Sequence, residues 1–127
     1  MPKRILIVDD NEDTRQIFAQ TLSGESYEVT LANDGDEALR KVGWTHPDLI
    51  LLDLMMPGVD GLRVCRALKQ NPAYRPIPIL MISAKFADPA SRQQAVEAGA
   101  EEILIKPINP SNLLAKIKTH LNKTDPA

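Results

Sequence analysis

The sequence has very little of what several classes of protein depend on. A single cysteine, Cys65, excludes an internal disulfide and fits a reducing cytosol. No apolar run approaches the roughly 20 residues that a membrane-spanning helix needs. The apolar run at residues 5–8 ends at two aspartates, too early for the core of a signal peptide. The net charge of −2 gives no general attraction to nucleic acid or anionic membranes.

The overall composition is typical of a soluble globular protein. Hydrophobic residues make up 43% of the chain and charged residues 25%, and 127 residues suffice for one hydrophobic core. We therefore expect a single cytoplasmic domain over residues 1–122. Residues 123–127 are expected to form a C-terminal tail or the start of a linker.

Short aliphatic runs alternate with segments of helical spacing along the chain. The runs predict buried strands, and the pairs Asp88–Pro89 and Asn109–Pro110 are typical of helix starts. Parallel strands need crossover connections of about this length, so the alternation predicts an α/β fold with helices on both faces of a parallel sheet. The expected strands are residues 4–8, 27–32, 48–53, 77–83 and 101–105, and the expected helices are residues 12–24, 35–43, 61–70, 88–100 and 109–121.

Polar side chains stand where four of the expected strands end. Taken singly, an aspartate after a strand is usually a helix cap or a turn residue, and a serine or lysine there is equally ordinary. In an open α/β sheet, however, ligands bind outside the carboxyl ends of the strands, so we expect these side chains to meet at one edge. They are Asp9 and Asp10 after the first strand, Asp53 in the third, Ser83 in the fourth and Lys106 after the fifth.

Three carboxylates in one place repel one another, and a fold that holds them together needs a cation. Oxygen ligands suit a hard divalent ion, and Mg²⁺ is commonly held by one or two carboxylates with waters and phosphate oxygens. A metal beside a carboxylate, with a lysine and a hydroxyl facing it, is suited to phosphoryl transfer. The strand ends therefore predict a magnesium-dependent phosphoryl-transfer site.

Four motifs, in this order and spacing, resemble the receiver domain of two-component response regulators, the CheY-like family. They are ILIVDD near the start, PDLILLDLMMPGVDG in the middle, ILMISA at the fourth strand and GAEEILIKP near the end, and they span essentially the whole chain. The resemblance implies a doubly wound five-stranded parallel sheet of order 2-1-3-4-5. This is the flavodoxin-like (βα)5 arrangement, a three-layer sandwich.

The resemblance implies roles for the acidic residues. Asp53 matches the phosphoacceptor, and Asp9 and Asp10 match the acidic pair that holds Mg²⁺, for which Mn²⁺ could substitute. Asp10 matches the direct ligand, and Asp9 is expected to act through a water molecule. The residue two after the phosphoacceptor, Met55, is expected to lend its backbone carbonyl to the metal.

Three further positions match residues that contact the phosphoryl group in the family. Ser83 matches the hydroxyl that turns toward it, and Ala84 matches the small residue beside that hydroxyl. Lys106 matches the lysine that pairs with a phosphoryl oxygen. The Lys106–Pro107 bond is expected to be cis, a state that proline makes accessible.

One position departs from the family pattern. Many receivers carry Tyr or Phe three residues before the lysine, as a switch whose ring moves between exposed and buried positions. Here that residue is Ile103, which has no ring to move. Phosphorylation of Asp53 stays the expectation, and the departure questions only the usual relay to the fourth and fifth helices.

The expected function is a phosphorylation-controlled signalling switch, not an enzyme with an external substrate. A sensor histidine kinase or a phosphotransfer protein would donate to Asp53, and the new charge would alter a protein-binding surface. The expected downstream partner is another protein or a fused output domain. Neither direct nucleic-acid binding nor membrane attachment is expected of this domain.

Alternative functions stay open on the sequence. A pseudo-receiver, which is never phosphorylated, is favoured by Ile103 and disfavoured by the complete acidic set with Ser83 and Lys106. A hydrolase with an aspartyl-phosphate intermediate needs a second acid two residues after the nucleophile, where this chain has Met55. A flavin-binding module needs a first loop that holds a phosphate, which the acidic stretch DDNED would repel.

The remaining candidate residues are expected to be structural. His46 and His120 have no partner at a metal-ligand spacing, and we expect both at the surface. Trp44 is expected to pack partly against the sheet edge. Cys65 lies at core spacing in its helix and is expected to be buried and inert.

Overall fold

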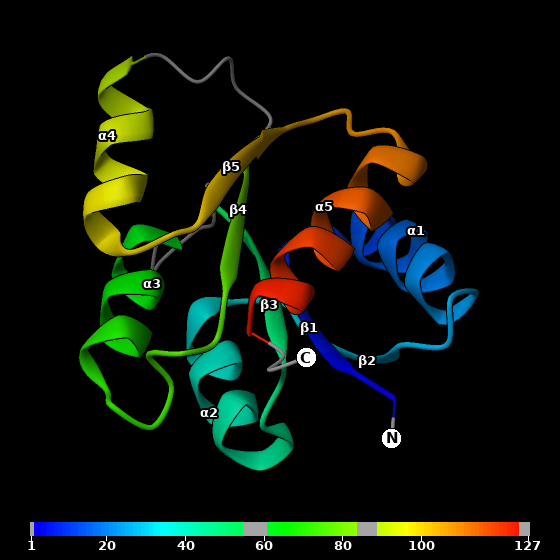
Figure 1. Cartoon of the computed structure of the whole chain (residues 1–127), viewed down its shortest axis with the longest axis horizontal. Coiled ribbons are helices and arrows are strands. Elements are labelled where there is room, and N and C mark those ends of the chain that lie inside the picture. Colours follow the sequence, from blue (N-terminus) through cyan, green and yellow to red (C-terminus); the bar gives the residue numbers. More distant parts are fainter. Residues whose placement is uncertain (1, 55–60, 84–88, 125–127) are drawn as a thin grey trace.

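The computed structural model describes residues 2–54, 61–83 and 89–124 of the chain. Strands and helices alternate along it, as the sequence predicts, and a helix follows each strand (Figure 1). None of the helices in these ranges is long and apolar enough to cross a bilayer. The elements are β1 (Arg4–Val8), α1 (Glu12–Ser23), β2 (Glu28–Ala32), α2 (Gly35–Thr45), β3 (Leu49–Asp53), α3 (Gly61–Gln70), β4 (Ile79–Ser83), α4 (Pro89–Ala98), β5 (Glu102–Ile105) and α5 (Pro110–Thr124).

The strands form one parallel sheet in the order β2-β1-β3-β4-β5. The predicted fold class and strand order are therefore confirmed. The central strand β3 is buried along its whole length, because helices cover both faces of the sheet. The register sets Val8 beside Leu52 and Ser83 beside Ile105, so the carboxyl ends of β1, β3, β4 and β5 lie along one edge.

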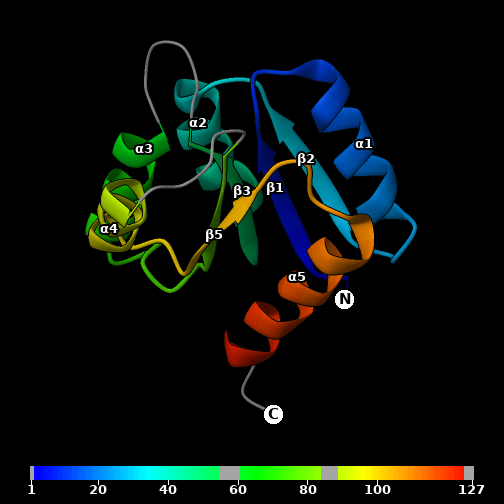
Figure 2. The ribbon, with the colours of Figure 1, turned by 90° about the horizontal axis from the view of Figure 1, so that it is seen from above.

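Two hydrophobic cores lie on opposite faces of the sheet. Figure 2 shows α1 and α5 on one face, and α2, α3 and α4 on the other. Side chains of β3 alternate between the cores: Leu49 and Leu51 pack under α1 and α5, and Ile50 and Leu52 pack under the other three helices. Burial of each such side chain contributes about 1.5–3 kcal/mol. The apolar run in the sequence thus supports both cores and holds Asp53 at the end of a rigid strand.

Several local predictions are confirmed at the ends of the elements. Pro89 and Pro110 are the first residues of α4 and α5. The Lys106–Pro107 peptide bond is cis. Asp88, the predicted cap of α4, lies outside the described residues.

Two surface predictions are wrong. Trp44 on α2, which was predicted to pack partly against the sheet edge, is 71% exposed. His120 on α5 is buried, and its Nε2 lies 3.0 Å from Oε1 of Glu102 on β5. Burial of Glu102 opposes its charge, but hydrogen bonds from Lys116 and His120 outweigh burial and lower the pKa of Glu102. His120 therefore belongs to the contact between α5 and the edge strand, whereas His46 is exposed as predicted.

Cys65 is expected to resist alkylation in the native protein. It is fully buried on α3, and burial raises the pKa of its thiol to about 11. At neutral pH about one thiol in ten thousand would then be ionised, and the thiolate is the reactive form. Intact mass after iodoacetamide treatment should show no adduct in buffer and one adduct in denaturant. Native alkylation as fast as that of a free thiol would contradict this burial.

Candidate functional site

Three carboxylates converge at the carboxyl edge of the sheet. One oxygen each of Asp9, Asp10 and Asp53 can be chosen so that all lie within 4.8 Å of one another. Asp9 is 1% exposed and Asp53 is 5% exposed, whereas Asp10 is exposed. β1 and β3 are neighbours in the sheet, and this adjacency brings residues from distant parts of the chain together. The fold therefore brings the three carboxylates close together, as the sequence predicts.

Lys106 supplies positive charge to this acidic cluster. Its Nζ lies 2.8 Å from Oδ2 of Asp9 and 3.8 Å from Oδ2 of Asp53. The backbone brings it there, because the Lys106 N–H donates to the carbonyl of Ser83 at 2.7 Å. One ammonium thus faces two buried carboxylates, with Asp10 as a third acid nearby. The remaining negative charge favours a further cation.

The loop after β1 holds Asp9 firmly. Its N–H donates to the carbonyl of Ala32 on β2 at 3.1 Å, and its Oδ1 accepts from the N–H of Asn11 at 2.9 Å. Asn11 in turn caps α1, because its side chain accepts from the N–H of Thr14. Each carboxylate oxygen of Asp9 therefore already accepts a hydrogen bond, from Asn11 or from Lys106. The exposed Asp10 is the acid better placed to offer lone pairs to a ligand.

Gly61 supports the end of β3 from the start of α3. A Cβ at this position would clash with the carbonyl oxygen of Asp53 and would lie 2.9 Å from Cα of Leu54. The Gly61 N–H also donates to the carbonyl of Leu54 at 3.3 Å. This role of Gly61 was not predicted from the sequence, although Gly61 ends the long motif around Asp53. The available signal was the glycine itself, since only glycine allows so close a backbone approach.

The structure describes some of the other predicted site residues and not all of them. Ser83 ends β4 at this edge and is 2% exposed. Ile103 on β5 is half-buried and packs against the core under α2, α3 and α4. The predictions for Met55 and Ala84 fall outside the described residues. The structure thus brings together five of the seven predicted site positions: Asp9, Asp10, Asp53, Ser83 and Lys106.

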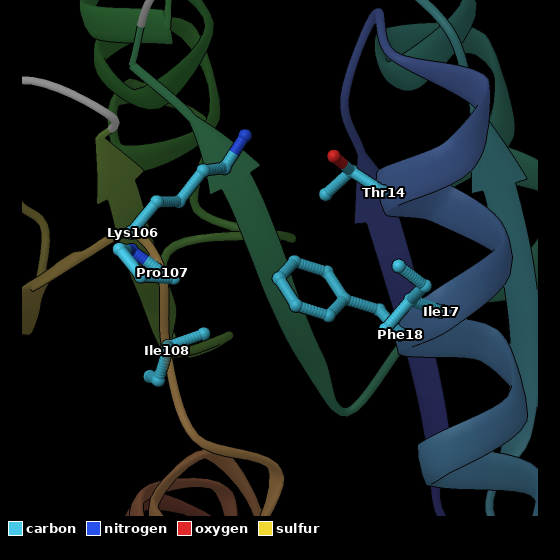
Figure 3. A pocket seen from close by; sticks show the side chains of 6 residues that line it. All are labelled: Thr14, Ile17, Phe18, Lys106, Pro107 and Ile108. Atoms are coloured by element: carbon cyan, nitrogen blue, oxygen red, sulfur yellow. The ribbon is translucent and has the colours of Figure 1, made fainter.

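A pocket of about 450 Å³ opens beside Lys106, between α1 and the segment that follows β5. Figure 3 shows side chains of α1 facing those of the segment across it. Ile17 on α1 is 57% exposed at this pocket. The lining residues are Thr14, Ile17, Phe18, Lys106, Pro107 and Ile108, so an apolar surface adjoins the charged site.

Known proteins are similar to this chain in sequence and in fold. A family model described as the response regulator receiver domain matches residues 5–118. The chain is 44% identical over 119 residues to the response regulator PleD of Caulobacter vibrioides, covering 94% of this chain and 26% of PleD. It is 37% identical to the DNA-binding response regulator MtrA of Mycobacterium tuberculosis, covering 98% of this chain and 53% of MtrA. The chain thus spans about a quarter and about half of these relatives.

Solved structures agree with this result. The chemotaxis protein CheY4 of Vibrio cholerae superposes with a TM-score of 0.89 at 34% identity, over 94% of this chain and 98% of that one. The doubly wound five-stranded sheet is therefore the CheY-like fold. The chain belongs to the response regulator receiver domain family.

Proposed function

We propose that this receiver domain is a phosphorylation-controlled switch whose phosphoacceptor is Asp53. The observation that supports the proposal is the cluster of three carboxylates beside Lys106. In the proposed transfer, the N–P bond of a phosphohistidine breaks and an oxygen of Asp53 forms the new bond to phosphorus. The donor is a sensor histidine kinase or a phosphotransfer protein. No external substrate is turned over, which fits a signalling family rather than a metabolic enzyme.

The donor set of the site fits Mg²⁺, a hard cation that prefers oxygen ligands. We assign Asp10 and Asp53 as direct ligands, with the backbone carbonyl of Met55 as a third. Asp9, whose oxygens already accept hydrogen bonds, would contact the metal through water. Mn²⁺ could substitute. The bound ion would neutralise charge on the phosphoryl oxygens.

Lys106 and Ser83 would bind the phosphoryl group after transfer. Lys106 Nζ lies 3.8 Å from Oδ2 of Asp53, so a small rotation would bring it to a phosphoryl oxygen on that carboxylate. Ser83, at the end of the adjacent strand β4, would donate its hydroxyl to another. Because Lys106 would then weaken its 2.8 Å contact with Asp9, the two states would differ in their contacts, as a switch requires.

The output of the switch is proposed to be a partner protein or a fused domain. The curated relatives extend well beyond the length that this chain covers. One of them is named a DNA-binding response regulator, so its additional length is where such an activity would be sought. For this chain, the proposal is that the phosphoryl charge changes a protein-binding surface.

Mass spectrometry tests the proposal. Incubation with Mg²⁺ and acetyl phosphate is expected to add one phosphoryl group to the intact protein, and EDTA is expected to prevent this. Asp53→Asn should gain no mass. Asp36→Asn, which changes an exposed aspartate on α2, should be labelled like the wild type. An unlabelled wild type, or equal labelling of Asp53→Asn, would show that the proposal is wrong.

A further inference from the structure

Every backbone and carboxylate polar atom of Asp9 has a partner in this structure. Its N–H donates a hydrogen bond to Ala32, and its two carboxylate oxygens accept hydrogen bonds from Asn11 and Lys106. The fourth partner is Arg15, whose Nη1 donates to the carbonyl oxygen of Asp9 at 2.7 Å. A guanidinium donor makes this a charge-assisted hydrogen bond, stronger than an ordinary one.

The geometry around Arg15 links it to Asp10. Arg15 lies in the first part of α1, is half-buried, and its own N–H donates to the carbonyl of Asn11 at 3.1 Å. Its side chain reaches back to the peptide group that joins Asp9 to Asp10. A peptide group is planar, so a fixed carbonyl oxygen of Asp9 also fixes the plane that contains the N and Cα of Asp10. Arg15 thereby fixes the position of the Asp10 Cα, from which the carboxylate of this exposed acid extends.

We propose that Arg15 is a positioning residue for the cation site, acting on the Asp9–Asp10 peptide rather than on the metal. The inference rests on the proposed function, in which Asp10 is a direct ligand. Loss of partners that orient metal ligands typically weakens metal binding about 10- to 100-fold. The positioning role therefore predicts weaker Mg²⁺ binding when the guanidinium is removed.

If Arg15 acted only through its charge, removing the guanidinium would change the Mg²⁺ affinity in the opposite direction. Arg15 is a cation that contacts the backbone of Asp9, one of the three clustered acids, so its charge alone repels a Mg²⁺ ion bound there. If charge were all that mattered, a neutral residue at this position would tighten Mg²⁺ binding. The direction of the change therefore separates the two roles.

Isothermal titration of the whole chain with MgCl₂, without any phosphodonor, tests the proposal. Arg15→Met is expected to weaken Mg²⁺ binding about 10-fold or more. Arg15→Lys, which keeps the charge and a donor, should recover part of the affinity. Arg40→Met, which changes an exposed arginine on α2, should bind like the wild type. Circular dichroism checks folding, and Arg15→Leu, which also lacks a donor and has the same expected loss, replaces Arg15→Met if that variant is unfolded.

Two results would overturn the proposal, and they are distinguishable. Affinity of Arg15→Met within about twofold of the wild type, or tighter, would overturn the positioning role and leave the proposed function intact. A wild type that binds no Mg²⁺ would overturn the metal part of the proposed function together with this inference.

Discussion

Lys106→Met is expected to lower the free energy of unfolding by about 2–3 kcal/mol in the absence of divalent cations. The side chain of Lys106 lies 2.8 Å from Asp9 and 3.8 Å from Asp53, whose side chains are 2% and 6% exposed. Removing the ammonium takes away the ion-pair partner of Asp9 beside a second buried carboxylate, Asp53. Urea unfolding in EDTA measures the loss, and added Mg²⁺ should reduce it.

The opposite sign is expected for Asp53→Asn, which should raise the free energy of unfolding by about 1 kcal/mol. This variant removes one of the two buried like charges and leaves Lys106 paired with Asp9.

Lys118→Met serves as the control for Lys106→Met. The 3.6 Å pair of Lys118 with Glu25 is largely exposed and should contribute below about 0.5 kcal/mol to the free energy of unfolding. A Lys106→Met variant as stable as the control would show that Lys106 does not offset the buried acids.

Gly61→Ala is expected to destabilise the fold by about 1–3 kcal/mol and to slow phosphorylation of Asp53 about 10-fold or more. The new Cβ would clash with the carbonyl oxygen of Asp53 and would lie 2.9 Å from Cα of Leu54. Because both neighbours are backbone, neither can rotate away as a side chain could. The end of β3 must shift, and Asp53, the proposed phosphoacceptor, shifts with it.

Gly24→Ala is the matched control for this substitution. Gly24 has ordinary right-handed backbone angles, and a Cβ there would approach nothing closer than 3.5 Å. That variant should be neutral or more stable by up to about 1 kcal/mol. Thermal unfolding and the rate of mass gain with acetyl phosphate measure both effects. Equal rates for Gly61→Ala and wild type would show that the α3 contact does not position Asp53.

Most of the fold follows from local patterns in the sequence. Buried parallel strands are continuous aliphatic runs, and the stretches before Asp9, Asp53 and Ser83 are of this kind. The site followed in turn, because side chains at the carboxyl ends of neighbouring parallel strands must lie close together. The spatial order of the strands came from the resemblance to a family, since periodicity does not distinguish one parallel order from another.

The error at His120 arose because the deciding contact joins residues that are distant in the sequence. His120 lies three positions after Ile117 and seven after Leu113, a core spacing on α5, yet a histidine suggested the surface. Its partner Glu102 is 18 residues away, and the sequence does not indicate that the two meet. The role of Gly61 was missed although the backbone that it contacts, at Asp53 and Leu54, is close in the sequence, because the two meet only after α3 docks.

The contact between Lys106 and Asp9 joins positions 97 residues apart, which has a consequence for protein synthesis. A ribosome releases Asp9 and Asp53 long before Lys106. Until β5 has joined β4, the acids have no ammonium from Lys106. A growing chain therefore cannot present the complete site until β5 has been made, and the proposed phosphorylation of Asp53 should begin only then. Premature termination before β5 would yield fragments without Lys106, and these should not compete with the finished protein for the proposed phosphodonor.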